Sequence, residues 1–438
     1  MSFRLSSSAL LSSTLCLAIA AGACGGVAHA PSGDTSPPSL DPAADTTPSP
    51  ATPATPAPKY PVGPYTGAVA TTDVSILYPL PTSAHAIDLV RASSAGSHGA
   101  LLPQSVVSTV LDGRVLERTG HASGYETLGL VSIRLDPCST RGSAGMPAAC
   151  RSEVRLVFQE LYDKLADEDG DPVAGPAGSD GGIHVTYDVP ESELVIMLKE
   201  MLTLKKANGD KGLLELAPHP ILTEQGLAGP FAQGLRDIVL EHVGDARIAR
   251  VTFFDHTNDE GDVWNFGVFD RITPGGALFA STIATTDSTT QSLSGSSTAG
   301  PLAGSTAEFF TAAAPTDSMA ALLDGSRPAP GSATVASLQP ALAAALRFEN
   351  PTMRSVETSD CISCHVAEGA HRLAEDVYGM SMAGAFTHAR SLARVDERKS
   401  VTNVHAFGYL HRQVAIMQRT ANESVLVAER MMSMLVPK

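Results

Sequence analysis

The pentapeptide Cys361-Ile362-Ser363-Cys364-His365 is the feature that most restricts how this chain can fold. Two cysteines separated by two residues can reach the two vinyl groups of one porphyrin, and each sulfur can form a thioether there. The histidine next to the second cysteine is then held at the iron as an axial ligand. The motif therefore predicts one covalent haem c, with Cys361 and Cys364 as attachment points and His365 as the proximal iron ligand. The chain must enclose that haem in a dry pocket.

Two other interpretations of the Cys-x-x-Cys pair stay open at this point. A redox-active dithiol is typical of a strand–CxxC–helix arrangement inside a βαβ unit, whereas this motif follows a polar turn at residues 350–360. Half of a zinc site would require a second Cys or His pair close by, and no cysteine follows Cys364. The position of the motif therefore favours haem over a dithiol or zinc.

Residues 336–438 resemble a small class I-like cytochrome c domain in their CxxCH motif, their size and their helical pattern. Helices are expected at 336–348, before the motif, and at 422–436, near the C-terminus, because apolar residues recur there at helical spacing. The resemblance implies that these two helices cross and that the region is mostly α-helical. It also implies one-electron transfer, and it does not extend to the residues before this region.

The sequence leaves the second axial ligand open among four residues that follow the motif. His405 is next to aromatic residues that could line the haem. Met380 and Met382 lie in a Gly- and Ala-rich segment expected to be a loop, and Met417 follows His365 at a distance compatible with the family. A histidine ligand would lower the reduction potential of the haem, and a methionine ligand would raise it.

Residues 1–23 have the pattern of a lipoprotein-type signal peptide. Arg4 supplies a positive charge, an apolar stretch follows at 9–21, and small residues precede Cys24. This arrangement resembles a bacterial lipoprotein processing site, which implies that Cys24 carries a lipid that anchors the chain to a membrane. The alternative is ordinary cleavage after Ala30. Either way the protein is expected to be exported, to the periplasm or the outer membrane.

Two low-complexity segments separate the remaining parts of the chain. Residues 24–69 are rich in Pro, Thr and Ser and are expected to form an extended, semi-rigid linker, because proline fixes φ and lacks an N–H. A connecting segment is expected at 285–335. The expected fold class is therefore an α+β N-terminal domain at 70–284, followed by a small, mostly α-helical cytochrome c-like domain at 336–438.

The sequence of residues 70–284 leaves the role of this region open. β-branched residues in partial alternation indicate half-buried strands, and apolar residues at spacings of three and four indicate amphipathic helices. Trp264 is expected to be a core residue rather than a site residue. No nucleophile elbow, P-loop, HExxH or Rossmann glycine pattern is present. Strands are expected at 127–135, 152–160 and 182–189, helices at 191–207 and 230–243, and a hairpin at 247–255 and 262–270.

Cys138 and Cys150 are expected to form a disulfide, because disulfides persist in exported proteins. A bond that closes so short a loop would stabilise the fold by about 3 kcal/mol through loop entropy. A zinc pair or two free thiols are less favoured, because no histidine lies between the two cysteines.

The formal net charge of −16 argues against nucleic acid as a partner, because phosphate binding requires a basic surface. From Cys361 onward, nine Lys and Arg residues outnumber seven Asp and Glu residues, and this asymmetry can steer an acidic redox partner toward the haem edge. The sequence thus predicts an exported, membrane-anchored monohaem c-type cytochrome, more an electron carrier than an enzyme. The alternative is a surface or periplasmic binding lipoprotein in which the haem is a sensor or accessory.

Overall fold

The computed structural model describes most of the chain beyond residue 67. The predicted signal peptide, Cys24, most of the linker and Met382 lie outside the described residues. No helix within the described residues is both long and apolar enough to cross a bilayer. The described ranges are 68–81, 90–111, 124–141, 149–166, 172–257, 262–295, 319–323, 328–355, 358–381, 383–386 and 404–436.

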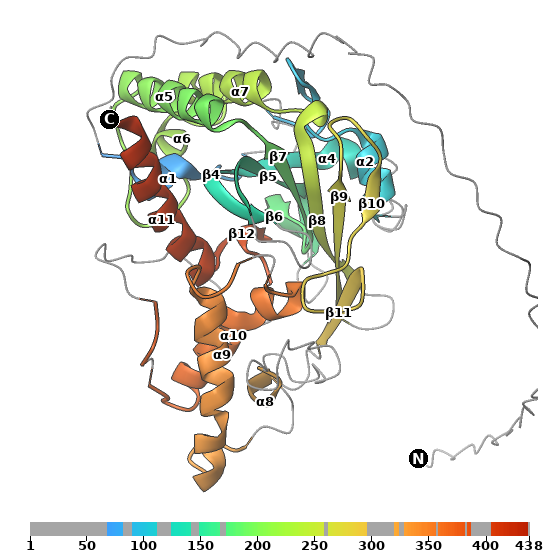
Figure 1. The fold of residues 1–438 in the computed structure, drawn as a ribbon, viewed down its shortest axis with the longest axis vertical. Helices are drawn as coiled ribbons and strands as arrows, with labels where there is room; N and C mark the ends of the chain where they lie inside the picture. The colour runs from blue at the N-terminus through green and yellow to red at the C-terminus, as the bar shows by residue number, and fades with distance from the viewer. Residues whose placement is uncertain are drawn as a thin grey trace, which may run out of the picture. The chain divides into compact units, whose positions relative to one another are not determined.

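An antiparallel sheet of nine strands dominates the described residues (Figure 1). Its strands are hydrogen-bonded in the order β1-β4-β5-β7-β8-β9-β10, with β6 paired to β5 and β11 paired to β9. The predicted strands and the predicted hairpin all belong to it. The strands are β1 (Ser75–Leu77), β4 (Leu128–Arg141), β5 (Ala149–Ala166), β6 (Pro172–Gly178), β7 (Gly182–Asp188), β8 (Ile248–Thr257), β9 (Asp262–Arg271), β10 (Leu278–Ala280) and β11 (Thr290–Gly295).

Alternate side chains of the central strands give the sheet one apolar face, which we call the core face. Phe158 on β5 and Tyr187 on β7 point to it and are fully buried. The helices α5 (Glu191–Ala207) and α7 (Pro230–His242) lie side by side over this face (Figure 1). The sequence predicts both helices correctly, and the predicted bounds of α5 are the same as the observed ones. The buried stripe of α5 consists of Leu194, Met197, Leu198, Met201 and Leu202.

Shorter elements complete the layer around the core face. Many of their apolar residues belong to the same buried cluster as α5 and α7. These elements are α1 (Thr71–Val74), α2 (Gln104–Leu111), α4 (Gly124–Thr127), α6 (Pro220–Gln225), the 3-10 helix η2 (Asp245–Arg247) and the two-stranded ladder of β2 (Ala95–Gly96) with β3 (Gly99–Ala100).

A small hairpin, β12 (Phe407–Leu410) with β13 (Gln413–Ile416), packs on the opposite face of the sheet. The side chain of Gln159 holds it in place. Its Oε1 accepts a hydrogen bond from the Tyr409 N–H, and its Nε2 donates to the Tyr409 carbonyl, both at 2.8 Å. Gly408 permits this approach, because a Cβ there would lie 2.5 Å from Oε1 of Gln159.

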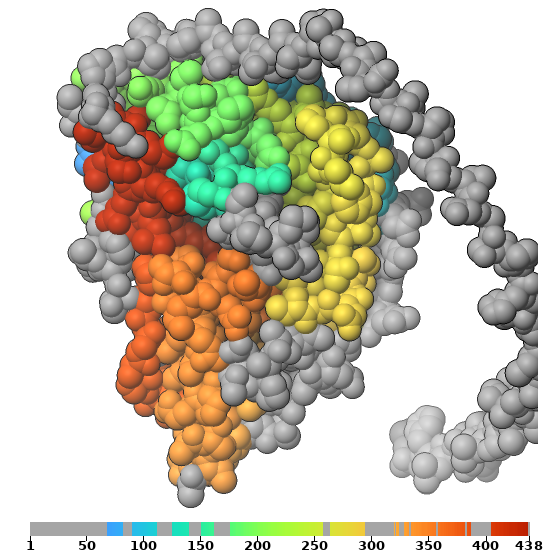
Figure 2. All heavy atoms as spheres, viewed as in Figure 1, coloured from blue at the N-terminus to red at the C-terminus, as the bar shows by residue number. Residues whose placement is uncertain are grey.

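The helix that carries the CxxCH motif and the helix before it also pack on this opposite face. α9 (Gln339–Glu349) and α10 (Cys361–Asp376) share a buried cluster with Trp264 and Phe266 of β9. Trp264 is a core residue, as the sequence predicts. In the space-filling view, the orange helices and the yellow strands form one continuous surface (Figure 2). Two short elements, α8 (Ala320–Leu323) and the 3-10 helix η5 (Ala333–Leu338), precede α9.

The C-terminal helix α11 (Gln418–Leu435) extends the main core rather than a separate one. Ala428, Met431 and Leu435 belong to the cluster beneath α5 and α7. The hydroxyl of Ser424 also lies 2.6 Å from the hydroxyl of Ser75 on β1. The helix begins four residues before its predicted start at residue 422.

The predicted fold class is therefore wrong. Instead of an α+β N-terminal domain followed by a small, mostly α-helical cytochrome c-like domain, the described chain is a large antiparallel sheet with helices on both faces. The apolar stripes predicted at 336–348 and 422–436 are present in α9 and α11, but they are buried in clusters that include residues of the sheet. The helical pattern alone could not distinguish burial against a sheet from burial against other helices.

Candidate functional site

The CxxCH motif forms the first turn of α10, and its neighbours fix where that helix begins. Asp360 is the N-cap residue, and its Oδ2 accepts hydrogen bonds from the Ser363 N–H and from Nε2 of Gln291, both at 3.0 Å. Oε1 of Gln291, on β11, accepts from the Ile362 N–H at 3.2 Å. Capping groups of this kind satisfy amides that an α-helix leaves unpaired at its start. The sheet thereby sets the position of the motif.

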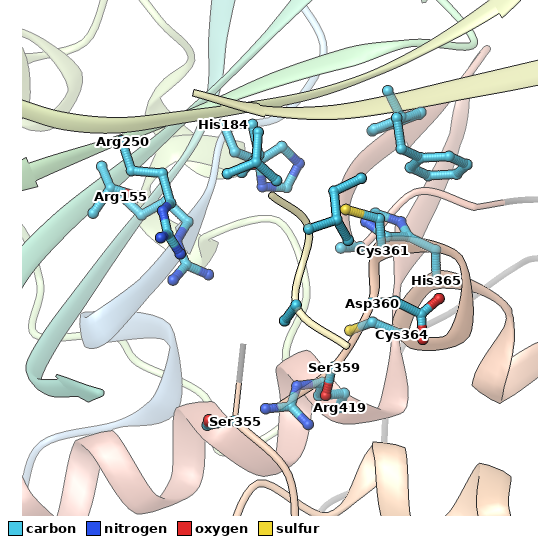
Figure 3. Close-up of a pocket in the computed structure, with 18 of the residues that line it drawn as sticks. Arg155, His184, Arg250, Ser355, Ser359, Asp360, Cys361, Cys364, His365 and Arg419 are labelled. Atoms are coloured by element: carbon cyan, nitrogen blue, oxygen red, sulfur yellow. The ribbon is translucent and has the colours of Figure 1, made fainter. Parts of the chain in front are cut away.

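Cys361, Cys364 and His365 all face one cavity of about 590 Å³ (Figure 3). Positions i, i+3 and i+4 share one side of a helix, so α10 directs the three side chains to the same wall. Strands β4, β5, β7, β8 and β9, residues 282–286 and the start of α11 also line the cavity. The volume lies within the range of about 300–1,000 Å³ that is typical of cofactor sites.

The sheet side of the cavity, which we call the cavity face, carries a row of cationic residues. Arg134 on β4 is opposite Arg155 on β5, Arg155 is opposite Thr186 on β7, and Thr186 is opposite Arg250 on β8. The next row along β7 places His184 beside these arginines (Figure 3). Because strand residues alternate between faces, this polar row uses the positions between the apolar residues of the core face.

Glu423 on α11 compensates much of this positive charge. It pairs with Arg134 and with Arg419, each at 2.8 Å. Burial opposes ionisation of Glu423, but the charges of Arg419, Arg134 and Arg155 outweigh burial and lower its pKa to about 2. The wall still has more cations than anions. The charged residues that line the cavity are Arg134, Arg155, Arg250, Arg419, Glu153, Glu423 and Asp360.

The two motif cysteines are half-buried thiols that are not joined in a disulfide. Burial, and then the charge of Asp360, raise the pKa of Cys361 to about 12, and burial raises that of Cys364. A redox-active dithiol requires the opposite, a thiolate with a lowered pKa. The described residues also contain no group of three or more His, Cys, Asp or Glu side chains placed to hold a metal ion. The raised pKa values of the two thiols therefore disfavour the dithiol interpretation.

His365 is held in a defined orientation. Its Nδ1 is hydrogen-bonded to the backbone carbonyl of Val404. Its ring packs against Phe254 and Phe266, with centroid distances of 5.6 and 5.1 Å. A metal-ligating histidine usually donates its Nδ1–H to a backbone carbonyl in this way, because the bond leaves the lone pair on Nε2 free for the metal.

The structure separates the four predicted distal ligands. Met417 is buried and lines the cavity. His405 does not line it, and its Nε2 is hydrogen-bonded to the Ser179 carbonyl at 3.1 Å. Met380 is buried in the cluster around α9 and α10, away from the cavity wall. Met382 lies outside the described residues.

Sequence reasoning missed His184, which reaches the cavity from β7. Its ring meets Phe254 edge-on at a centroid distance of 6.3 Å. Burial, reinforced by nearby positive charges, holds its pKa well below the usual range, so the imidazole is neutral. A signal was present, because His184 interrupts the apolar series Ile183, Val185 and Tyr187 and must face the other side of the sheet. Only the fold shows that α10 covers that side.

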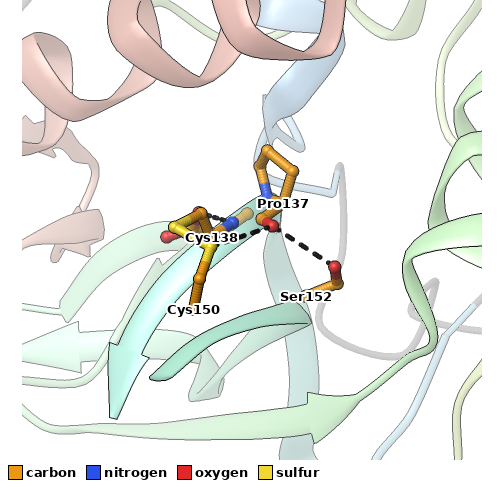
Figure 4. The surroundings of a disulfide bond; sticks show 5 residues. Pro137, Cys138, Cys150 and Ser152 are labelled. Carbon is orange, nitrogen blue, oxygen red and sulfur yellow. Dashed lines mark hydrogen bonds between the residues drawn. A yellow bond between two sulfur atoms is a disulfide. The ribbon is translucent and has the colours of Figure 1, made fainter. Parts of the chain in front are cut away.

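The Cys138–Cys150 disulfide is present, as predicted, where β4 and β5 leave the sheet (Figure 4). The ladder between the two strands shifts register between Asp136 and Ser139. Oδ1 of Asp136 accepts from the Cys138 N–H at 2.9 Å. Because Ser139 lines the cavity, the disulfide closes the strand pair next to one edge of the site.

Comparison with protein-family models, with curated proteins and with solved structures finds no match for this chain. The cavity itself gives one further indication of a ligand. Ser359 Oγ and Asp360 Oδ1 lie on its wall, are buried and have no hydrogen-bond partner among the described residues. Buried polar atoms are rarely left unpaired, so a bound group or water is expected next to them.

Proposed function

We propose that this protein carries one covalent haem c, attached through Cys361 and Cys364 with His365 as an axial ligand, and transfers single electrons. One observation supports this proposal above all others. The two thiols and the imidazole of the motif face the same cavity from a single helix, and that cavity has the volume of a cofactor site.

The attachment chemistry suits the groups that the chain presents. Each thiol would add across one vinyl double bond, with sulfur on one carbon and hydrogen on the other, so attachment consumes no oxidant or reductant. The bond from Nδ1 of His365 to the Val404 carbonyl would keep the imidazole aimed at the iron. The iron, when bound, supplies the one-electron chemistry.

The walls of the cavity suit a flat apolar ring with acidic substituents. Phe254 and Phe266 supply apolar surface next to His365. Guanidinium groups bind carboxylates in pairs of hydrogen bonds, so the arginines of the cavity face are suited to the two haem propionates. Residues 70–284 would thus have a role, because their strands form a wall of the site. The arginines concerned are Arg134, Arg155 and Arg250 on the cavity face, together with Arg419 on α11.

Export and membrane anchoring are part of the proposal and are supported by the sequence alone. Lipid at Cys24 would hold the protein at the periplasmic or outer-membrane surface, where an acidic redox partner could dock at the haem edge. Replacing Cys24 with Ser should release the protein from the membrane fraction. Membrane retention of this variant would exclude lipid at Cys24 as the anchor.

The test of haem attachment is a haem stain on a denaturing gel, together with a pyridine-haemochrome spectrum of the purified full-length protein. The protein should be produced in a bacterium with intact cytochrome c maturation. We expect one covalent haem per chain, and none in the Cys361→Ala/Cys364→Ala variant. The matched control is Cys138→Ser/Cys150→Ser, which removes two other cysteines and should keep the haem.

The proposal fails if the wild-type chain, folded and exported, contains no covalent haem. It also fails if the haem content of the two double variants is the same. In either case the cavity must be reassigned to a ligand that the CxxCH motif does not hold.

A further inference from the structure

The cavity has two sides from which an iron ligand could come. Within the part of the chain that the structure describes, two lining residues outside the motif carry atoms that ligate haem iron, namely His184 and Met417. A second axial ligand must approach the iron from the side opposite His365. The question is therefore which of the two belongs to the opposite wall.

Met417 belongs to the same wall as the motif. The next residue, Gln418, donates its backbone N–H to Oε2 of Glu368 at 2.7 Å. Glu368 is on α10, less than one turn beyond His365. The start of α11 is therefore tied to the helix that carries the proximal ligand, and this tie places Met417 beside that helix rather than on the sheet.

His184 belongs to the sheet wall. It lies on β7, a central strand, opposite Val157 on β5 and Thr252 on β8. Pairing on both sides gives the imidazole a rigid support, which is what a ligand position requires. Both His184 and His365 contact the ring of Phe254, at centroid distances of 6.3 and 5.6 Å. The two imidazoles therefore reach the same part of the cavity from different elements.

The imidazole of His184 makes no hydrogen bond to any residue that the structure describes. The half-buried ring lies on the cavity wall, so a group bound in the cavity can reach its nitrogens. Its neighbours along the ladder are Val157, which cannot pair with it, and Thr252. An iron ligated by His184 would supply the missing partner.

We propose that His184 is the second axial ligand of the haem, opposite His365, so that the iron has two histidine ligands. This inference rests on the proposed covalent haem. It selects a residue from outside the C-terminal region, and it predicts a lower reduction potential than a His/Met pair would give.

The experiment compares the full-length wild type with His184→Ala, His184→Met and Met417→Leu, and measures haem content and ferric spectra in the same samples. We expect the wild type to be low-spin, without the methionine–iron absorption band. His184→Ala should keep its covalent haem, become high-spin and recover the wild-type spectrum when imidazole is added. His184→Met should gain the methionine–iron band and have a higher reduction potential.

A matched control is His411→Asn, which removes an exposed histidine in the turn between β12 and β13. It should leave the spectra unchanged. A wild-type methionine–iron band that disappears in Met417→Leu would overturn the inference in favour of Met417. An unchanged low-spin spectrum in His184→Ala would overturn it as well. Absence of covalent haem from the wild type would overturn the proposed function and this inference together, and the haem assay identifies that case.

Discussion

The two faces of the central sheet are made by the same strands but have opposite characters. On β5 and β7 the core face carries Phe158 and Tyr187, which are buried beneath α5 and α7. The alternate residues on these strands include Arg155 and His184, which face the cavity under α10. One face is filled with apolar side chains, and the other keeps an open volume lined by charged and polar groups.

This difference separates the energetic roles of the two faces. Apolar burial on the core face stabilises the fold, whereas the cavity face buries arginines whose desolvation must be offset by partners. We therefore expect substitutions on the core face to change mainly the free energy of unfolding. Substitutions on the cavity face should change mainly what the cavity binds, except where they remove a partner of a buried charge.

The largest expected effect is on the core face, at Phe158. Phe158→Ala removes a fully buried ring and should lower the free energy of unfolding by about 3–5 kcal/mol, because the cavity it leaves cannot close fully. Thr252→Ala, on the cavity face, should cost less than about 1 kcal/mol. Urea unfolding followed by circular dichroism measures both. Equal costs for the two variants would contradict the division of roles between the faces.

Much of this arrangement can be predicted from the sequence, because local periodicity reports which side of an element is buried. The helix at 191–207 and the strand at 182–189 agree closely with α5 and β7. Periodicity does not show which other element of the fold buries that side. The stripe at 336–348 predicts burial but not burial in one cluster with residues of β9, and the polar position of His184 does not reveal that a CxxCH helix lies above it. Such contacts join residues far apart in the chain. The family resemblance implied that the predicted helices pack against each other, so packing against the sheet was not expected.

A second prediction concerns Glu423, the carboxylate that compensates Arg134 and Arg419 on the cavity face. Its folded-state pKa of about 2 lies below its ordinary value of 4.5, so its contribution to stability is present above pH 4.5 and is lost as the pH falls toward 2. Glu423→Gln should lower the free energy of unfolding at pH 7 by about 2–4 kcal/mol, because it leaves buried guanidinium groups under-compensated.

The pH profile provides the check on that prediction. Between pH 4.5 and 2 the stability of the wild type should fall more steeply than that of Glu423→Gln. The exposed Glu224, which pairs with Lys211 on the surface, is the control, and Glu224→Gln should cost less than about 1 kcal/mol. If the unfolding free energies of the wild type and Glu423→Gln fall in parallel with pH, Glu423 does not compensate the charges of Arg134 and Arg419.

A third prediction concerns a buried charged group in the helical layer that covers the core face. His242 on α7 is buried between Glu193 and Glu200 of α5, at 3.0 and 2.7 Å. Burial opposes protonation of His242, but hydrogen bonds to the two carboxylates outweigh it and raise the pKa to about 9. The raised pKa means that its contribution to stability is full below pH 6.5 and is lost as the pH rises through 9.

The wild type should therefore lose about 2–3 kcal/mol of unfolding free energy between pH 6.5 and 9, and His242→Gln should remove most of this dependence. Denaturant unfolding at several pH values measures the slope. His219 serves as an internal contrast, because its pKa is lowered to about 3 and its titration falls outside this range. A slope in His242→Gln as steep as in the wild type would assign the pH dependence to another group.

A small stability effect is expected at Arg250, although this residue belongs to the cationic row of the cavity face. Its guanidinium makes two hydrogen bonds to Asp270, at 2.7 and 3.1 Å, and both side chains are partly exposed. Arg250→Gln should therefore cost only about 1 kcal/mol of unfolding free energy.

If the row binds haem propionates, the loss of one positive charge in Arg250→Gln should favour the ferric state and lower the reduction potential. Arg412→Gln, in the exposed turn between β12 and β13, removes the same charge away from the cavity. A redox titration in which both variants shift equally would mean that the arginine row has no specific role at the haem.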